Sequence, residues 1–138
     1  DFVVDGKPVD FAKTWSYKGF GYSGVPNMGS VFGYINASWT LRADLICTYV
    51  CRLLNHMKET DTEICTPELR ESDKDMPERP WIDSFTSGYM ELSMHKFPRQ
   101  SDREPWINPQ NFKRDKKMFR KSPIEDGAMR FTKSRARV

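Results

Sequence analysis

The sequence predicts an α/β fold in which a short strand passes through a tight corner into a long amphipathic helix. A turn is indicated at Gly24-Val25-Pro26-Asn27, because Pro fixes φ while Gly and Asn tolerate turn conformations. The β-branched and aromatic run from Ser30 to Ile35 is typical of a strand. After the polar corner Asn36-Ala37-Ser38, apolar residues recur every four positions, at Leu45/Ile46, Tyr49/Val50, Leu53/Leu54 and Met57. A strand that feeds a helix in this way is the half-unit of an α/β layer fold.

The predicted helix has two candidate N-caps and one apolar face. Ser38 or Asn36 can cap it, since a side-chain oxygen there can accept from the free backbone N–H groups. No Glu follows three residues later, so no capping box is expected. The apolar stripe is expected to pack against a sheet. The polar residues should mostly take the other side; they are Arg42, Asp44, Arg52, Asn55 and Lys58.

The composition argues against a self-contained core. Apolar residues make up 38% of the 138 residues and charged residues 30%, and apolar density is highest before Met57. We therefore expect the rest of the chain to lie across another surface. The chain starts at Asp1 without a Met, which suggests a fragment, and nothing in it resembles a signal peptide. No apolar run approaches the roughly 20 residues that span a bilayer.

Other segments carry weaker signals. Residues 2–9 indicate a hairpin with an Asp-Gly turn, and residues 59–79 indicate an acidic, proline-broken loop. Beyond it, helical turns are predicted at residues 89–95 and 111–120. The tail reads as a series of aromatic anchors on polar spacers, namely Trp81, Phe85, Tyr89, Phe97, Trp106, Phe112, Phe119 and Phe131.

Three runs of sequence carry a family resemblance. They are Gly24-Val25-Pro26-Asn27, then Gly33-Tyr34-Ile35-Asn36-Ala37-Ser38-Trp39-Thr40-Leu41, then Cys51-Arg52-Leu53-Leu54-Asn55. In these runs the chain resembles the C-terminal part of flavin-dependent monooxygenases of the Baeyer–Villiger type, in the branch that includes the ethionamide-activating enzymes. The tail is similar to the same branch at Arg79-Pro80, Phe85, Gly88-Tyr89, Pro98, Gln100, Pro105-Trp106, Asn111, Asp115 and Asp126-Gly127. Ser101 departs from it, because the relatives commonly carry Gly there.

The resemblance implies the C-terminal fragment of a flavoprotein with two dinucleotide-binding domains, for FAD and NADP, and a long irregular aromatic-anchored tail. Residues 1–58 would be the last piece of the FAD-binding domain (edge hairpin, strand and long helix). Residues 59–79 would be an acidic linker, and residues 80–138 an extended tail with short helical turns. The parent enzyme would use FAD and NADPH to insert or transfer one oxygen atom from O2 through a peroxyflavin. Its substrate would be a ketone, or a thioether, thioamide or amine.

The resemblance also implies where this chain meets the cofactor. A helix start gathers free N–H groups and the positive end of the helix dipole, which favours negative charge. The corner Asn36, Ala37, Ser38, Trp39, Thr40 and Leu41 would line the flavin and substrate cavity, with Trp39 and Leu41 as its apolar wall. The Gly-rich dinucleotide motifs and the catalytic arginine are expected upstream, in missing N-terminal FAD and NADP domains. The isolated chain is therefore expected to be inactive.

Other sites are weakly indicated by the residues themselves. Cys47, Cys51 and Cys65 form no CxxC pattern and favour free thiols in a reducing compartment, hence the cytoplasm, with no metal bound. The Gly19-x-Gly21-x-x-Gly24 spacing is broken by Pro26 and predicts no phosphate site. The remaining titratable groups are expected to be solvated; they are His95, Asp73/Asp75 and Glu125/Asp126. His56 is an exception, because it lies near the C-terminus of the predicted helix.

Two other functions stay open. Residues 111–138 hold ten Lys/Arg against three Asp/Glu, and such a basic, aromatic-rich tail could grip nucleic acid. A solvated tail, or one docked on an acidic surface, is the favoured interpretation, so no nucleic-acid partner is expected. The third possibility is a shortened, inactive relative that serves as a scaffold or interaction piece.

Overall fold

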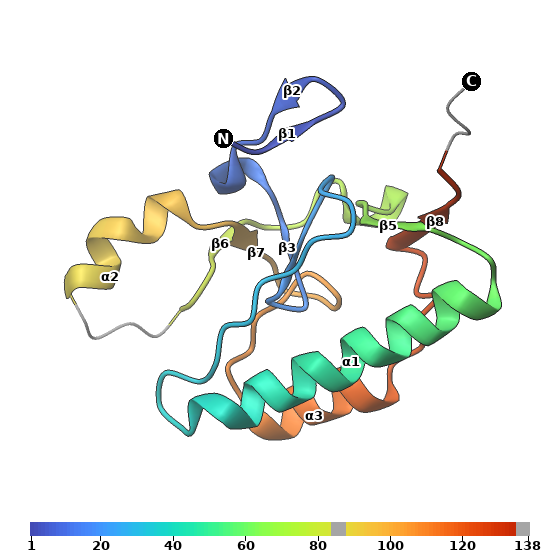
Figure 1. Cartoon of the computed structure of the whole chain (residues 1–138). Helices are drawn as coiled ribbons and strands as arrows, with labels where there is room; N and C mark the ends of the chain where they lie inside the picture. Colours follow the sequence, from blue (N-terminus) through green and yellow to red (C-terminus); the bar gives the residue numbers. More distant parts are fainter. Residues whose placement is uncertain (84–87, 135–138) are drawn as a thin grey trace.

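The structure is a computed structural model, and it describes residues 1–83 and 88–134. Two helices run side by side, α1 (Trp39–Glu59) and α3 (Phe112–Lys121), with the remaining segments gathered on one side of this pair (Figure 1). A short helix, α2 (Gly88–Ser93), lies away from the pair. Single 3₁₀ turns occur at η1 (Phe11–Lys13), η2 (Glu71–Asp73) and η3 (Met94–Lys96).

Within the described residues, the strands form four antiparallel pairs. β5 (Ile64–Pro67) pairs with β8 (Met129–Thr132), placing Ile64 opposite Thr132 and Pro67 opposite Met129. The other pairs are two residues long; they are β1 (Val3–Val4) with β2 (Lys7–Pro8), β3 (Ser16–Tyr17) with β4 (Gly21–Tyr22), and β6 (Arg79–Pro80) with β7 (Arg99–Gln100). The fold is thus mixed helix and strand, as expected, but α1 does not lie on a layered sheet.

The prediction that the chain lacks a core of its own is wrong. The buried apolar residues of α1 are Leu45, Ile46, Tyr49, Leu53 and Met57. They pack in one cluster with Met118 and Phe119 of α3 and with the aromatic rings of Tyr17, Phe20 and Trp106. The stripe therefore meets a helix, aromatic rings and residues of short strand pairs, whereas one sheet was expected. A few large rings suffice, because each buries 150–250 Å² and so offsets the low apolar fraction.

The segment from Ser30 to Ile35 does not form the predicted strand; residues 30–34 have no regular secondary structure and Ile35 lies in a bend. A strand needs a neighbouring backbone, and here the polar groups of the segment are bound mainly by side chains. Arg42 donates to the Phe32 carbonyl at 2.7 Å, and Gln110 bonds on both sides of Tyr34. The residue pattern could not show that a neighbouring strand is missing from the described part of the chain.

Residues 59–79 are more ordered than the predicted loop, since they contain β5 and η2. The turn at residues 24–27 explains part of this order, with Gly24 and Asn27 both at positive φ. Asn27 is hydrogen-bonded to β5 and to the residue before it. Its backbone N–H donates to the Cys65 carbonyl and its Oδ1 accepts from the Cys65 N–H, both at 2.9 Å, and its Nδ2 donates to the Glu63 carbonyl at 3.0 Å. The wider division into 1–58, 59–79 and 80–138 stays a prediction about a parent protein.

Several local predictions are confirmed. The Asp-Gly hairpin forms β1 and β2, with Asp5 and Gly6 both at positive φ. The predicted helical turns are α2 with η3, and α3. Trp81, Trp106 and Phe119 are buried anchors, but Phe112 is 41% exposed; Phe85 lies outside the described residues.

Of the helices in the described part, none is both long and apolar enough to cross a membrane.

Truncating Leu53 tests the core directly. The side chain is 6% exposed on the buried face of α1, so Leu53→Ala should lower the free energy of unfolding by about 2–5 kcal/mol. Urea unfolding of the two proteins measures the difference. Leu54→Ala is the matched control, because Leu54 is 58% exposed and its truncation should have little effect. Equal losses in the two variants would contradict this packing.

Candidate functional site

The six predicted site residues, Asn36 to Leu41, lie together at the start of α1 and are all exposed. Trp39 is 47% and Leu41 44% exposed, so two large apolar side chains face outward beside the polar corner. The predicted cap is not formed: Ser38 occupies the N-cap position, but its hydroxyl lies 3.0 Å from that of Thr40 and accepts no backbone bond. The first turn holds no acidic residue. The positive end of α1 is therefore neither capped nor neutralised by its own residues.

The Trp39 ring is held by its neighbours, although it is half exposed. Its centroid lies 4.8 Å from that of Phe32, which in turn packs edge-on to buried Trp81 at 4.6 Å. Gly33 lies under the indole, because a Cβ there would come within 2.4 Å of the ring. The Gly in the Gly33-Tyr34 motif thus has a physical reason: any side chain would push Trp39 from its place.

The segment just before the corner is hydrogen-bonded to the tail by Gln110, a residue that the sequence analysis did not single out. Its side-chain Nε2 donates to the Gly33 carbonyl at 3.2 Å, and its Oε1 accepts from the Ile35 N–H at 3.1 Å. A small recess of about 120 Å³ lies between the corner and the tail, lined among others by Asn36, Ile82 and Phe112. A bond between a side chain and a backbone group 75 positions apart leaves no pattern in a single sequence.

A buried ion pair lies one turn further into α1, and it overturns the prediction that Arg42 takes the polar side. Arg42 Nε is 3.5 Å from Asp115 Oδ2 on α3, and both side chains are fully buried. Arg42 also donates to the Phe32 and Lys18 carbonyls, and the Tyr34 hydroxyl donates to Asp115 at 2.7 Å. Burial lowers the pKa of Arg42 and raises that of Asp115, against the opposing effect of each partner. This cluster joins α1, α3 and the corner.

Two cations meet the C-terminal end of α3, where backbone carbonyls lack helical partners. Buried Lys18 donates to the Ser122 hydroxyl at 2.6 Å, and Arg52 donates to the Phe119 and Ser122 carbonyls at 2.5 and 2.8 Å. Positive charge is favourable at this end of the helix dipole. Burial nonetheless lowers the pKa of Lys18 to about 8, with Asp126 and Glu104 opposing the shift and Arg52 adding to it.

Lys18 should make stability rise with pH. The unfolded lysine has a pKa near 10.5, so between pH 8 and 10.5 the unfolded chain binds more protons than the folded one. The contribution of Lys18 to the free energy of unfolding is therefore lowest below pH 8 and increases as pH rises. Relative to Lys18→Met, the wild-type chain should gain about 2 kcal/mol between pH 7 and 9.5. Urea unfolding of both proteins at the two pH values measures it, and a difference that does not change with pH would contradict a buried ionisable Lys18.

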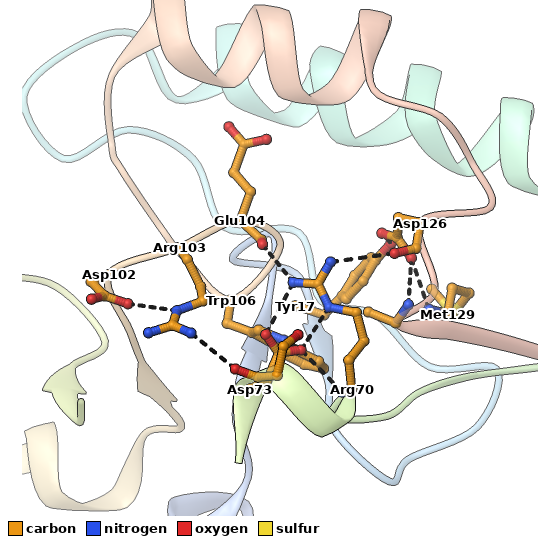
Figure 2. Close-up of polar contacts among 11 residues, drawn as sticks. Tyr17, Arg70, Asp73, Asp102, Arg103, Glu104, Trp106, Asp126 and Met129 are labelled. Carbon is orange, nitrogen blue, oxygen red and sulfur yellow. Dashed lines mark hydrogen bonds and ion pairs between the residues drawn. The ribbon is translucent and has the colours of Figure 1, made fainter. Parts of the chain in front are cut away.

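A second polar cluster is centred on Arg70 (Figure 2). Arg70 binds both oxygens of Asp73 at 2.8–3.0 Å and donates to the carbonyls of Glu104 and Asp126. Trp106 Nε1 donates to Asp73 at 2.8 Å. Burial would raise the pKa of Asp73, but the hydrogen bonds from Arg70 and Trp106 outweigh it and hold the pKa below its usual value.

The same cluster corrects the expectation that Asp73 and Asp126 are solvated. Asp73 is 1% exposed, and Asp126 accepts from the Tyr17 hydroxyl at 2.5 Å and from the N–H groups of Ala128 and Met129. Burial raises the pKa of Tyr17 well above its usual value, with help from Tyr49 and Asp126. Arg70, Asp73, Trp106, Tyr17 and Asp126 are hydrogen-bonded to one another or to nearby backbone groups, so the cluster joins loops to the core.

The other candidates are dispersed. Asp75, Glu125 and His95 are exposed, as expected. His56 Nε2 lies 3.1 Å from Glu125 Oε1 and packs on Phe131. The three cysteines are free thiols, with Cys47 and Cys51 exposed and Cys65 buried. All three line an apolar groove of about 680 Å³ along α1, where Val31 and Leu54 are half exposed.

Comparison with known proteins gives a consistent set of relatives. The chain is 43% identical over 136 residues to the FAD-containing monooxygenase EthA of Mycobacterium tuberculosis, covering 99% of this chain and 27% of that protein. It is 40% identical to EthA of Mycolicibacterium smegmatis, covering 97% and 27%. It is 37% identical to the probable FAD-binding monooxygenase AlmA of Acinetobacter baylyi, covering 95% and 26%. The chain spans about a quarter of the length of these curated relatives. No family model and no solved structure matches it.

Proposed function

Because this chain is homologous to a quarter-length segment of FAD-containing monooxygenases, we propose that it forms one wall of the flavin site in such an enzyme. The observation that carries the proposal is the start of α1, which is exposed, uncapped and free of acidic residues. The relatives' names support FAD and an oxygenase reaction. NADPH as the reductant, and a ketone, sulfur or nitrogen centre as the substrate, are the finer parts of the proposal.

The residues of the corner suit a flavin. When bound, FAD would supply the redox chemistry, with NADPH as the proposed source of electrons and O2 as the source of the oxygen atom. The uncapped N–H groups and dipole at Ser38–Thr40 would favour negative charge on a bound ring edge, by about 0.3–1 kcal/mol at an exposed site. Trp39 and Leu41 would exclude water from that edge and shape the apolar side of the substrate cavity.

The apolar groove along α1 would receive the rest of the parent protein. Its lining includes Val31 and Leu54, which are half or more exposed in this chain. The curated relatives are about four times longer, so most of their residues lie outside the matched segment. We assign the groove to an apolar face of the FAD-binding domain. The catalytic residues and the nucleotide-binding motifs would lie in that part and not in this chain.

Two preparations test the proposal. The isolated chain should neither retain FAD nor oxidise NADPH. A chimera in which these residues replace the matching 136-residue segment of M. tuberculosis EthA should purify with bound FAD and consume NADPH. EthA without the segment is the control and should lose the cofactor. A folded, colourless chimera would reject the flavin role and favour an inactive interaction piece.

The nucleic-acid alternative has one observation in its favour. The outer face of α3 carries six exposed cations, which are Lys113, Arg114, Lys116, Lys117, Arg120 and Lys121. Binding to single strands also needs aromatic rings on which bases stack. Trp81, Trp106 and Phe119 are buried in this chain, which leaves the basic face with few stacking partners. We therefore propose no nucleic-acid partner.

A further inference from the structure

Gln110 has an unusual backbone as well as a bridging side chain. Its φ is +50°, in the left-handed region that residues other than Gly seldom occupy. Such residues persist where the surrounding structure holds them, and they cluster at functional sites. Gln110 lies just before Asn111, whose side chain caps α3 by accepting from the Arg114 N–H at 3.0 Å. The capped helix therefore provides a fixed base from which the Gln110 amide reaches the corner.

The Gln110 side chain holds residues 33–35, which have no strand partner within the described part of the chain. Among the described hydrogen bonds, the Gly33 carbonyl and the Ile35 N–H each have the Gln110 side chain as their partner. The residue between them, Tyr34, is tied to Asp115 on the buried face of α3. Three bonds from the tail thus fasten three successive residues immediately before Asn36. Among the described hydrogen bonds, none joins the exposed residues Asn36 to Leu41 to the tail, and the next tie is the Arg42–Asp115 pair.

We propose that Gln110 is a positioning residue, whose amide fixes the path by which residues 33–35 enter the corner (Asn36 to Leu41) and thereby the direction in which the helix start and Trp39 face. That the corner faces a flavin rests on the proposed function. That Gln110 positions the corner rests on the hydrogen bonds and backbone angles alone. A shift of the corner would move both the free N–H groups of the helix start and the apolar wall formed by Trp39 and Leu41. The tail would therefore set the geometry of the site without contacting the cofactor.

Gln110→Gly separates this role from general stability. Gly is at ease at positive φ, so the variant relieves the backbone while it removes both amide bonds. In the isolated chain we expect an unchanged or higher melting temperature, together with about tenfold faster amide hydrogen exchange at Ile35 and Leu41, whose N–H groups are hydrogen-bonded. Gln110→Glu keeps an acceptor for the Ile35 N–H but cannot donate to Gly33, so its exchange rates should be intermediate. Asn111→Ala is the matched control: it should lower the melting temperature but leave the corner no faster than the rest of the chain.

The outcomes are separable. Unchanged exchange at Leu41 in Gln110→Gly, or equal acceleration throughout the chain, would overturn the positioning role, because the Leu41 amide is not itself bound by Gln110. Faster exchange confined to the corner supports it, and the EthA chimera then tests what the corner faces. Weaker FAD retention by the chimera carrying Gln110→Gly would support both proposals. Full FAD retention despite a loosened corner would support the positioning role and reject the flavin-facing assignment.

Discussion

Replacing Arg42 by methionine is expected to lower the free energy of unfolding by about 3–5 kcal/mol, because Asp115 would be left as a buried charge without its partner. The loss should be larger than for a simple change in packing, since the Phe32 and Lys18 carbonyls also lose their donors. Urea unfolding at pH 7 measures it. The substitution also releases one of the contacts that tie α1 to the segment before the corner.

Two controls make this result specific to the buried pair. Arg42→Met combined with Asp115→Leu removes both charges and should recover at least about 1 kcal/mol of the loss. Arg120→Met breaks an ion pair with Asp44 in which both side chains are exposed, and it should change stability by less than about 1 kcal/mol. If the double variant is no more stable than Arg42→Met, the unpaired charge is not the cause.

Trp106→Ala should be similarly severe, at about 3–5 kcal/mol, because the indole is fully buried in the aromatic core. Its ring packs edge-on to Tyr17 at 5.7 Å, and its N–H contacts Asp73 in the cluster of Figure 2. Trp106→Phe keeps most of the apolar volume and removes only the N–H donor, so it should cost about 1–3 kcal/mol. Thermal or urea unfolding of the three proteins distinguishes the two contributions.

The phenylalanine variant also carries a pH signature. Asp73 has a lowered pKa in the folded chain, so its contribution to stability is present above the unfolded pKa and is lost as pH falls through the folded pKa. Removing the Trp106 hydrogen bond should raise the folded pKa of Asp73, and acid unfolding should then begin at a higher pH than in the wild-type chain. An acid-unfolding midpoint that is the same in both proteins would show that the bond does not stabilise the carboxylate.

Local chemistry could be predicted from the sequence where neighbouring residues decide it. The Asp-Gly hairpin, the long helix with its apolar stripe and the helical turns of the tail follow from short-range patterns, and the structure confirms them. The corner from Asn36 to Leu41 was predicted as a unit and is one, at an exposed helix start. Its role beside a flavin came from the family resemblance, not from residue patterns, and stays a proposal.

What could not be predicted depends on partners far apart in the chain. Arg42 looks like a surface residue until Asp115 on α3 is placed opposite it. Ser30–Ile35 looks like a strand because propensity does not reveal whether a neighbouring strand exists. Gln110 shows no motif, since its role depends on a backbone 75 residues away. The apparent lack of a core had the same origin: averages of composition hide a few large rings that meet in space.

The electrostatics of the α1 start give the most direct test of the flavin-wall assignment, in the FAD-loaded EthA chimera. Thr40→Glu places a carboxylate in the first turn, where an acidic residue stabilises the helix itself. If this turn faces the flavin, the same charge should make the two-electron reduction potential about 5–20 mV more negative, while the melting temperature does not fall. Thr40→Gln introduces a neutral side chain of the same size as Glu and should leave the reduction potential unchanged. A Thr40→Glu chimera that binds FAD with an unaltered potential would contradict the assignment of this corner to the flavin site.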